Sequence, residues 1–157
     1  MRPGVKISLI AVGRLKDKHA AALCADYSER VARYTPWELV EVKDARGESP
    51  DRAPPLEAER LLGKLPTGSY VVTLDEHGTQ LTSVDFSRWL ARRQQDGRDL
   101  RFVLGGPWGL GDLVRDRADE SLRLSDMTLP HELARVVFLE QLYRAFTILR
   151  GSKYHHV

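Results

Sequence analysis

The chain alternates between short apolar runs and longer segments in which apolar residues recur every three or four positions. Short runs bounded by glycine, proline or charged residues are typical of buried strands, whereas the three-to-four spacing is typical of helices. Strands are therefore expected at 5–13, 37–43, 69–75, 100–106 and 121–125. Helices are expected at 17–34, 56–66, 82–97, 111–120 and 130–150. The alternation predicts an α/β fold with a mainly parallel sheet and helices on both of its faces.

Several residues at the ends of these segments agree with the predicted boundaries. Asp17 is suited to cap the first helix, and Thr82 or Ser83 is suited to cap the third. Pro130 opens the last helix, where the missing N–H of proline costs nothing. The segment 44–55 is polar and rich in proline, so it is expected to be a mobile loop.

Three loops should meet at one edge of the predicted sheet. The segments TLDEHG, GGPWGLG and LSDMTLPH follow the third, fourth and fifth expected strands. In parallel sheets, ligands bind beyond the carboxyl ends of the strands. The three segments should therefore line one crevice.

The glycine-rich segment does not match a phosphate-binding loop. A dinucleotide fingerprint needs glycines at positions i, i+2 and i+5, and neither Gly106 nor Gly109 begins such a set. A Walker loop ends in Gly-Lys-Ser/Thr, whereas Asp112 follows Gly111 here. What is left is a tight turn after a strand, which is either a plain connection or a cradle for a ligand without phosphate.

The last expected helix is apolar on nearly every side. At 100° per residue, one stripe is uninterrupted: Ala134, Phe138, Leu142, Ala145, Phe146 and Leu149. The opposite side mixes polar with apolar residues: Leu133, Val136, Val137, Glu140, Gln141, Tyr143, Arg144 and Ile148. A small sheet covers only one face of a helix, so a second copy of the chain is expected to cover the other.

Composition limits the function classes without selecting one. A length of 157 residues fits one domain spanning 1–157. A net charge of +2 permits a nucleic-acid partner without indicating one, and the single cysteine, Cys24, excludes an internal disulfide. No apolar stretch approaches a membrane span and no cleavage signal follows the first strand, so a cytoplasmic protein without membrane contact is expected.

Several segments together resemble a known family across essentially the whole chain. They are KISLIAVGRLKD, TLDEHGTQLTSVDFSRWL, FVLGGPWGLG, LRLSDMTLPHELARVVFLEQLYRAFTILRG and the ending YHHV. In this order they resemble the RlmH-type rRNA methyltransferases, which belong to the SPOUT class. The resemblance implies a C-terminal trefoil knot, a homodimer, and methylation of N3 of a pseudouridine in 23S rRNA of the large ribosomal subunit, with S-adenosyl-L-methionine as methyl donor.

The resemblance also implies a set of residues that bind the methyl donor. It places the methionine–ribose part against Gly105 and Gly106, and the adenine between Leu74 and the backbone of Leu124, Ser125, Asp126, Met127, Thr128 and Leu129. For Asp126 a backbone role is expected, with its side chain toward solvent. No metal is expected, because His155 and His156 lack further ligands.

Three residues are expected to serve the RNA side of the reaction. Arg144 stays charged, so it suits phosphate anchoring or stabilisation of negative charge on the uracil oxygens. Tyr154 would orient the base, and His155 would accept the N3 proton near neutral pH. The competing interpretations are an ion pair between Arg144 and Glu140, four residues apart, and a frayed C-terminal tail.

Two other functions stay open from the sequence. One is a SPOUT methyltransferase that acts on another RNA uridine, and the other is a ribosome-binding module without catalysis. The near-complete cofactor loops argue against the module, and the absence of an extra RNA-binding segment in these 157 residues argues against a transfer-RNA enzyme.

Overall fold

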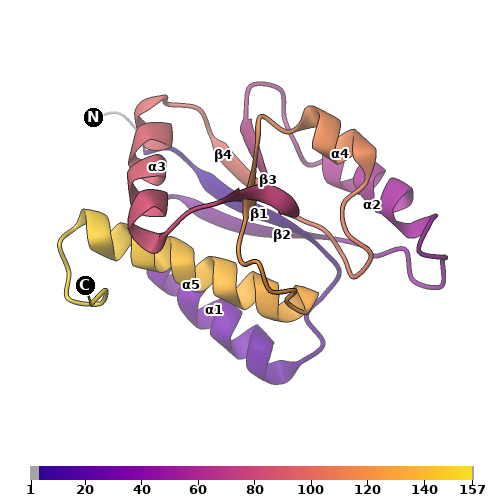
Figure 1. Ribbon diagram of the computed structural model, residues 1–157, viewed down its shortest axis with the longest axis horizontal. Helices are drawn as coiled ribbons and strands as arrows, with labels where there is room; N and C mark the ends of the chain where they lie inside the picture. Colours follow the sequence, from indigo (N-terminus) through magenta and orange to yellow (C-terminus); the bar gives the residue numbers. More distant parts are fainter. Residues whose placement is uncertain (1–3, 157) are drawn as a thin grey trace.

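The computed structural model describes residues 4–156. A five-stranded sheet forms its centre, with strand order β2-β1-β4-β3-β5 and parallel pairing between all neighbours (Figure 1). The strands are β1 (Ile7–Val12), β2 (Trp37–Val42), β3 (Tyr70–Gln80), β4 (Leu100–Leu104) and β5 (Glu120–Arg123). The helices are α1 (Lys18–Ala32), α2 (Ala53–Leu62), α3 (Ser83–Gln95), α4 (Asp112–Arg117) and α5 (His131–Leu149).

Helices cover both faces of the sheet, and each face has its own apolar core. Alternate residues of β1 show the division, because successive side chains of a strand point to opposite faces. Leu9 packs in the cluster that also holds Phe138 of α5, on the face covered by α1, α3 and α5. Ile10 packs with Leu61 of α2 on the face covered by α2 and α4. The α/β fold with helices on both faces is confirmed, whereas the knot and the single-domain assignment stay predictions.

The sequence-based boundaries are confirmed where a local side chain sets them. The carboxylate of Asp17 accepts hydrogen bonds from the backbone N–H groups of His19 at 2.7 Å and Ala20 at 3.1 Å, which caps α1. Of the two candidates for the cap of α3, Thr82 is the cap, because its hydroxyl accepts a hydrogen bond from the N–H of Asp85 at 3.0 Å. The second strand, β2, lies at the edge of the sheet.

Several expected boundaries are wrong, including the following three. β3 continues to Gln80 rather than ending at residue 75, because it pairs with β5 a second time after an irregularity. α2 begins at Ala53 inside the proline-rich segment, since prolines fit the first turn of a helix, where the N–H has no partner. β5 ends at Arg123, so residues 124 and 125 belong to the following loop.

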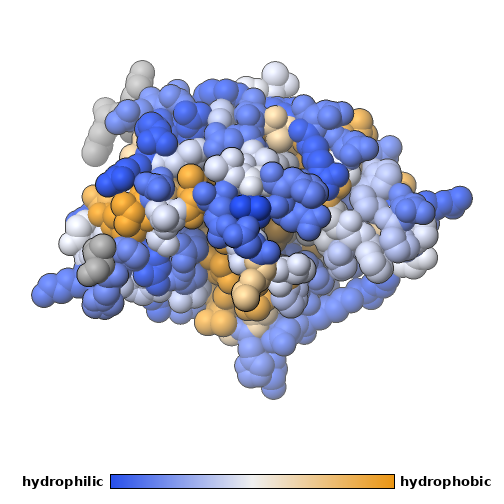
Figure 2. All heavy atoms as spheres, in the orientation of Figure 1, coloured by the Kyte–Doolittle hydropathy of each residue, from blue (hydrophilic) through white to orange (hydrophobic). Residues whose placement is uncertain are grey.

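The last helix is covered more fully within one chain than the sequence suggested. α5 packs against both α1 and α3 as well as the sheet, so its apolar side chains find partners on three sides. Leu133 of α5 and Leu23 of α1 stay 46% and 45% exposed, and apolar residues gather over these two helices low in Figure 2. The apolar pattern alone is therefore weaker support for a dimer than expected.

No helix within residues 4–156 is long and apolar enough to cross a membrane.

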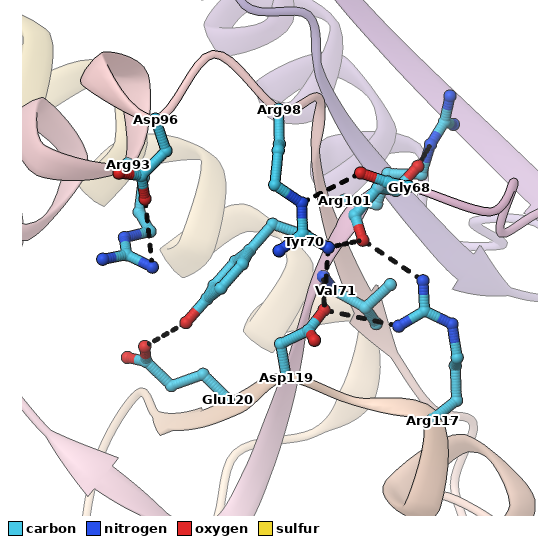
Figure 3. A network of polar contacts seen from close by, with 11 residues as sticks. Gly68, Tyr70, Val71, Arg93, Asp96, Arg98, Arg101, Arg117, Asp119 and Glu120 are labelled. Carbon is cyan, nitrogen blue, oxygen red and sulfur yellow. Dashed lines mark hydrogen bonds and ion pairs between the residues drawn. The ribbon is translucent and has the colours of Figure 1, made fainter.

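A polar network joins the amino ends of β3 and β5 (Figure 3). It lies at the end of the sheet opposite to the carboxyl ends of the strands. Asp119 accepts a hydrogen bond from the N–H of Val71 at 2.8 Å and pairs with the guanidinium of Arg117 at 3.3 Å. Arg98 and Arg117 both donate to the carbonyl of Ser69, at 2.8 and 3.2 Å. These two arginines therefore stabilise the fold.

Replacement of Asp119 by alanine should destabilise the protein by about 1–3 kcal/mol, because the N–H of Val71 and the neighbouring guanidinium groups lose their acceptor. Chemical denaturation would measure the change in the free energy of unfolding. Asp96→Ala is a matched control, since Asp96 is exposed and its one ion pair within residues 4–156 is with Arg93 at 3.3 Å. Equal stability of the two variants would contradict the structural role of Asp119.

Candidate functional site

A cleft of about 950 Å³ opens at the carboxyl ends of β3, β4 and β5. The three segments expected to meet there do so, and they supply most of its lining. All residues predicted to bind the methyl donor line this cleft: Leu74, Gly105, Gly106, Leu124, Ser125, Asp126, Met127, Thr128 and Leu129. The topology therefore brings the predicted cofactor residues into one place, and their binding role stays a prediction.

The irregularity in β3 shapes one wall of this cleft. β3 pairs with β5 up to Leu74, which lies opposite Leu122, and then again from Thr79, which lies opposite the same Leu122. Gly78 permits this close approach, since a Cβ there would lie only 2.5 Å from the carbonyl carbon of Leu122. Residues 75–78 lie between the two pairings and bulge out of the ladder, and residues 75–77 line the cleft.

The glycine turn after β4 forms a second wall. The N–H of Gly109 donates to the carbonyl of Gly106 at 3.0 Å, and Gly109 has a φ of +89°, which favours glycine. A Cβ on Gly105 would lie 2.7 Å from the carbonyl oxygen of Gly109. The turn's own packing thus requires glycine at position 105.

Gly105→Ala should therefore disturb the turn, destabilising the protein by about 1–3 kcal/mol and weakening any ligand held against it. Thermal unfolding and ligand titration would measure the two effects. Gly63→Ala is the matched control, because Gly63 ends α2 with a helical φ of −62° and a Cβ there has its nearest contact at 3.4 Å. If Gly105→Ala behaves like this control, the turn does not need a glycine at that position.

Residues 124–129 form the third wall and offer mainly backbone groups. Within the described part of the chain, the only hydrogen bond that engages their backbone runs from the N–H of Met127 to the hydroxyl of Ser125 at 3.0 Å. The side chain of Asp126 is 74% exposed and pairs with Arg123 at 2.9 Å, consistent with a backbone role in the cleft. Free N–H and C=O groups beside apolar Leu74 and Leu129 suit the edge and face of an adenine ring.

The charged side chains in the cleft are paired with one another. Arg115 contacts the carboxylate of Asp75 at 2.9 Å and that of Asp112 at 3.5 Å. The hydrogen bond to Asp75 is the main cause that raises the pKa of Arg115, so this guanidinium stays charged. Among residues 4–156, no group of three or more His, Cys, Asp and Glu side chains lies close enough to hold a metal ion.

The residues predicted for the RNA side of the reaction form a separate cluster, the tail cluster, made of Glu140, Arg144, Tyr154 and His155. Arg144 donates to one oxygen of Glu140 through Nε at 3.0 Å and Nη2 at 2.6 Å. Tyr154 donates to the same oxygen at 3.0 Å, and the guanidinium of Arg144 lies 4.8 Å from the centre of its ring. The tail is thus bound to α5 through residue 155, while Val157 lies outside the described residues.

Burial and hydrogen bonding determine which groups of this cluster act as proton donors and which as acceptors. Burial, with the neighbouring Tyr27 and Glu140, raises the pKa of the Tyr154 phenol, so Tyr154 is a proton donor at neutral pH rather than a base. A guanidinium can only donate, so the contact of 3.0 Å between Nη1 of Arg144 and Nδ1 of His155 makes Nδ1 an acceptor. A neutral His155 then carries its proton on Nε2, and it can accept another only if it leaves Arg144.

The cleft lies at the start of α5, where His131 and Ala134 line it, whereas the tail packs against the second half of that helix. Figure 1 shows the chain leaving the far end of α5 into this tail. Ala134 lines the cleft, and Arg144 follows it by ten residues on the same helix. At a rise of about 1.5 Å per residue, the two positions are separated by about 15 Å. A single chain therefore does not bring the predicted RNA-side residues to the predicted cofactor residues.

Arg135 is a buried polar residue near the cleft that the sequence analysis did not identify. It is 2% exposed, pairs with Glu41 of β2 at 2.6 Å, and donates to the carbonyls of Val12 at 3.3 Å and Gly13 at 3.0 Å. These contacts fix the start of α5 to the ends of β1 and β2. Its position within an apolar run was the only sequence signal, and that signal does not identify a partner.

Comparison with solved structures defines the fold class. The fold resembles a probable methylase family protein from Haemophilus influenzae, with a TM-score of 0.51, 12% identity, and coverage of 99% of this chain and 71% of that one. It also resembles a probable rRNA-methyltransferase from Porphyromonas gingivalis, with a TM-score of 0.54, 13% identity, and coverage of 96% and 72%. At these identities the similarity shows a shared fold.

Sequence comparison identifies the family. The family model described as "Predicted SPOUT methyltransferase" matches residues 5–155. The ribosomal RNA large subunit methyltransferase H of Gemmatimonas aurantiaca is 43% identical over 153 residues, covering 96% of this chain and 99% of that protein. The protein of the same name from Anaeromyxobacter sp. is 47% identical over 152 residues, with the same coverage. The chain belongs to the SPOUT methyltransferase family.

Proposed function

We propose that this protein transfers a methyl group from S-adenosyl-L-methionine to N3 of a pseudouridine in 23S rRNA of the large subunit. The observation that carries the proposal is 43–47% identity, over 96% of the chain, to proteins named ribosomal RNA large subunit methyltransferase H. The natural substrate is the assembled ribosome, and the reaction takes place in the cytoplasm. The modest net charge of +2 agrees with a structured ribosomal surface as the target rather than naked RNA.

The cleft has the features that the methyl donor requires. The donor carries an adenine, a ribose and a positively charged sulfur, and it supplies the methyl group. Gly105 and Gly106 would hold its methionine–ribose part, while Leu74 and residues 124–129 would enclose its adenine. A turn fixed by its own packing would hold the donor in one orientation. Methyl transfer requires the acceptor nitrogen to lie in line with the methyl–sulfur bond. Fixed orientation therefore supplies much of the rate of the reaction.

The tail cluster has the chemistry that the pseudouridine requires. Transfer forms a bond between the methyl carbon and N3, breaks the bond between that carbon and sulfur, and releases the N3 proton. Arg144 would stabilise the negative charge that develops on the uracil oxygens, because it is positively charged and held rigidly by Glu140. Tyr154 would orient the base as a hydrogen-bond donor, and His155 would take the proton after it releases Arg144.

The two halves of the site belong to different copies of the chain in this proposal. Cleft and tail cluster are separated along α5, and a two-fold axis near the middle of that helix would exchange its two ends. The cleft of one copy would then face the tail cluster of the other. The interface would include the surface of α5 around Val137, Glu140, Gln141 and Arg144, which is half-buried in the isolated chain.

The protein should therefore form a homodimer at micromolar concentration. Light scattering coupled to size exclusion should give twice the chain mass of 17.8 kDa, because half of each site comes from the second copy. A mass near 17.8 kDa under conditions where the enzyme is active would rule out a site shared between two copies.

Two measurements test the proposed function against its alternatives. Calorimetry should detect binding of S-adenosylmethionine, and labelled methyl groups should enter the large subunit of assembled ribosomes that lack the modification. Cofactor binding without any transfer would favour a ribosome-binding module. Transfer to tRNA in preference to ribosomes would favour a methyltransferase with another uridine as substrate.

A further inference from the structure

A buried carboxylate lies behind the glycine turn. Glu57 of α2 is only 3% exposed, although glutamate is rarely buried without a partner. Its Oε2 accepts a hydrogen bond from the N–H of Ala45 at 3.0 Å, whereas its Oε1 is buried without a hydrogen-bond partner. Within residues 4–156, no lysine, arginine or histidine forms an ion pair with it.

One residue of backbone separates this carboxylate from the cleft. Gly106 lines the cleft, and a Cβ on Gly106 would lie 3.1 Å from Oε1 of Glu57 and 3.4 Å from Oε2. The start of α2 also packs against the end of the turn, since a Cβ on Gly111 would lie 2.7 Å from the carbonyl of Pro54. The position of Glu57 relative to the turn is therefore fixed by packing.

An uncompensated buried carboxylate is costly, and an apolar residue of similar size would fill the same space at lower cost. The carboxylates of Asp75 and Asp126 in the cleft wall have arginine partners, at 2.9 Å in each case. Glu57 differs from them, because it has no ion-pair partner among residues 4–156. The guanidinium of Arg60 on the same helix is engaged instead by the carbonyls of Lys43 and Asp44, each at 2.9 Å, so a cation bound in the cleft would offset the charge of Glu57 from the other side of the turn. Backbone atoms that exclude water from the space between them would keep this attraction strong.

We propose that Glu57 makes the cleft selective for a positively charged ligand on the Gly106 turn. This inference rests on the proposed function, in which the ligand is the sulfonium donor S-adenosylmethionine. Transfer of the methyl group leaves the electron pair of the broken bond on sulfur, so the product S-adenosylhomocysteine has a neutral thioether at that position. Glu57 would thus hold the donor more tightly than the spent product and favour exchange of product for donor. This attraction acts in the ground state, so it raises donor affinity without speeding the chemical step.

Glu57→Gln tests the charge while keeping the shape and an acceptor for the N–H of Ala45. Calorimetry on the purified protein would measure the dissociation constants of S-adenosylmethionine and S-adenosylhomocysteine. We expect donor affinity to fall by on the order of tenfold, as Coulomb attraction at an effective dielectric constant of about 20 implies, with product affinity unchanged. Glu59→Gln on the same helix is the matched control, because Glu59 is exposed. It should change neither affinity.

If Glu57→Gln lowers the affinity for both ligands equally, Glu57 only supports the turn. If it changes neither affinity, the charge of Glu57 does not act on a ligand in the cleft. Either result would overturn the inference. If the variant does not fold, the unaltered protein gives the same test. An analogue with a protonated nitrogen in place of the sulfonium should bind more tightly than S-adenosylhomocysteine, and equal binding would overturn the inference. Failure of the unaltered protein to bind either adenosyl compound would instead refute the proposed function.

Discussion

Replacement of Arg144 by alanine should lower methyl transfer to ribosomes at least tenfold while leaving the affinity for S-adenosylmethionine unchanged. Loss of one charge-assisted contact in the transition state costs about 2–4 kcal/mol, and about 1.4 kcal/mol already corresponds to tenfold in rate. Cofactor affinity should be unaffected, because the donor is expected to be held by the residues that line the cleft, and Arg144 is not one of them. Single-turnover transfer and calorimetry on the same preparation would measure the two quantities.

Two further variants separate catalysis from structure in this experiment. Arg144→Ala leaves Glu140 without its cation, so Arg144→Ala combined with Glu140→Gln removes that unpaired charge and should still show the loss of transfer. Arg88→Ala removes an exposed helix arginine with a similar short-range pair, to Asp85 at 3.4 Å, and should leave transfer unchanged. Recovery of transfer in the double variant would mean that Arg144 serves only to neutralise Glu140.

Deletion of residues 154–157 should have a larger effect, lowering transfer by about a hundredfold or more. It removes the group proposed to orient the base and the group proposed to accept the proton, and general acid–base catalysis alone contributes about 10²–10⁴-fold. The homodimer and cofactor binding should both be preserved, because the tail contacts α5 without lining the cleft. Deletion of residues 156–157 alone is the control and should retain most of the activity. Full transfer by the longer deletion would show that the tail is only a frayed end.

Mixed dimers show which copy supplies the tail. A chain with Gly105→Val has a damaged cleft and an intact tail, and a chain that lacks 154–157 has the reverse. In a mixed dimer, a shared site can form from the cleft of one chain and the tail of the other, so part of the transfer should return. If both halves of the site had to come from the same chain, the mixed dimers would be as inactive as the two separate variants.

The parts of the fold that could be predicted are those fixed by residues close together in the sequence. Asp17 and Thr82 cap helices through N–H groups two or three residues away, so the sequence alone identifies them. The extension of β3 could not be predicted in the same way. It depends on Gly78 meeting Leu122, which is far away along the chain. The packing of α5 against both α1 and α3 likewise depends on tertiary contacts, and the spacing of apolar residues along the sequence does not predict these contacts.

The same distinction applies to the candidate site, where some features follow from the topology and others depend on partners distant in sequence. The meeting of three loops at one cleft followed from a general property of parallel sheets, so the cofactor residues could be placed together in advance. Glu57 and Arg135 were missed because their burial is set by partners distant in sequence, such as Gly106 and Glu41. The contacts that bind Tyr154 and His155 to Glu140 and Arg144 likewise appear only in three dimensions.

Mapping of the methylated atom tests the central claim most directly. The purified protein would be incubated with isotope-labelled S-adenosylmethionine and ribosomes from cells that lack this methyltransferase. The 23S rRNA would then be digested to nucleosides and fragments for mass spectrometry. We predict label in a single nucleotide, a pseudouridine that carries the methyl group on N3. Label on another atom or another RNA, or no label in an active cofactor-binding preparation, would contradict the account.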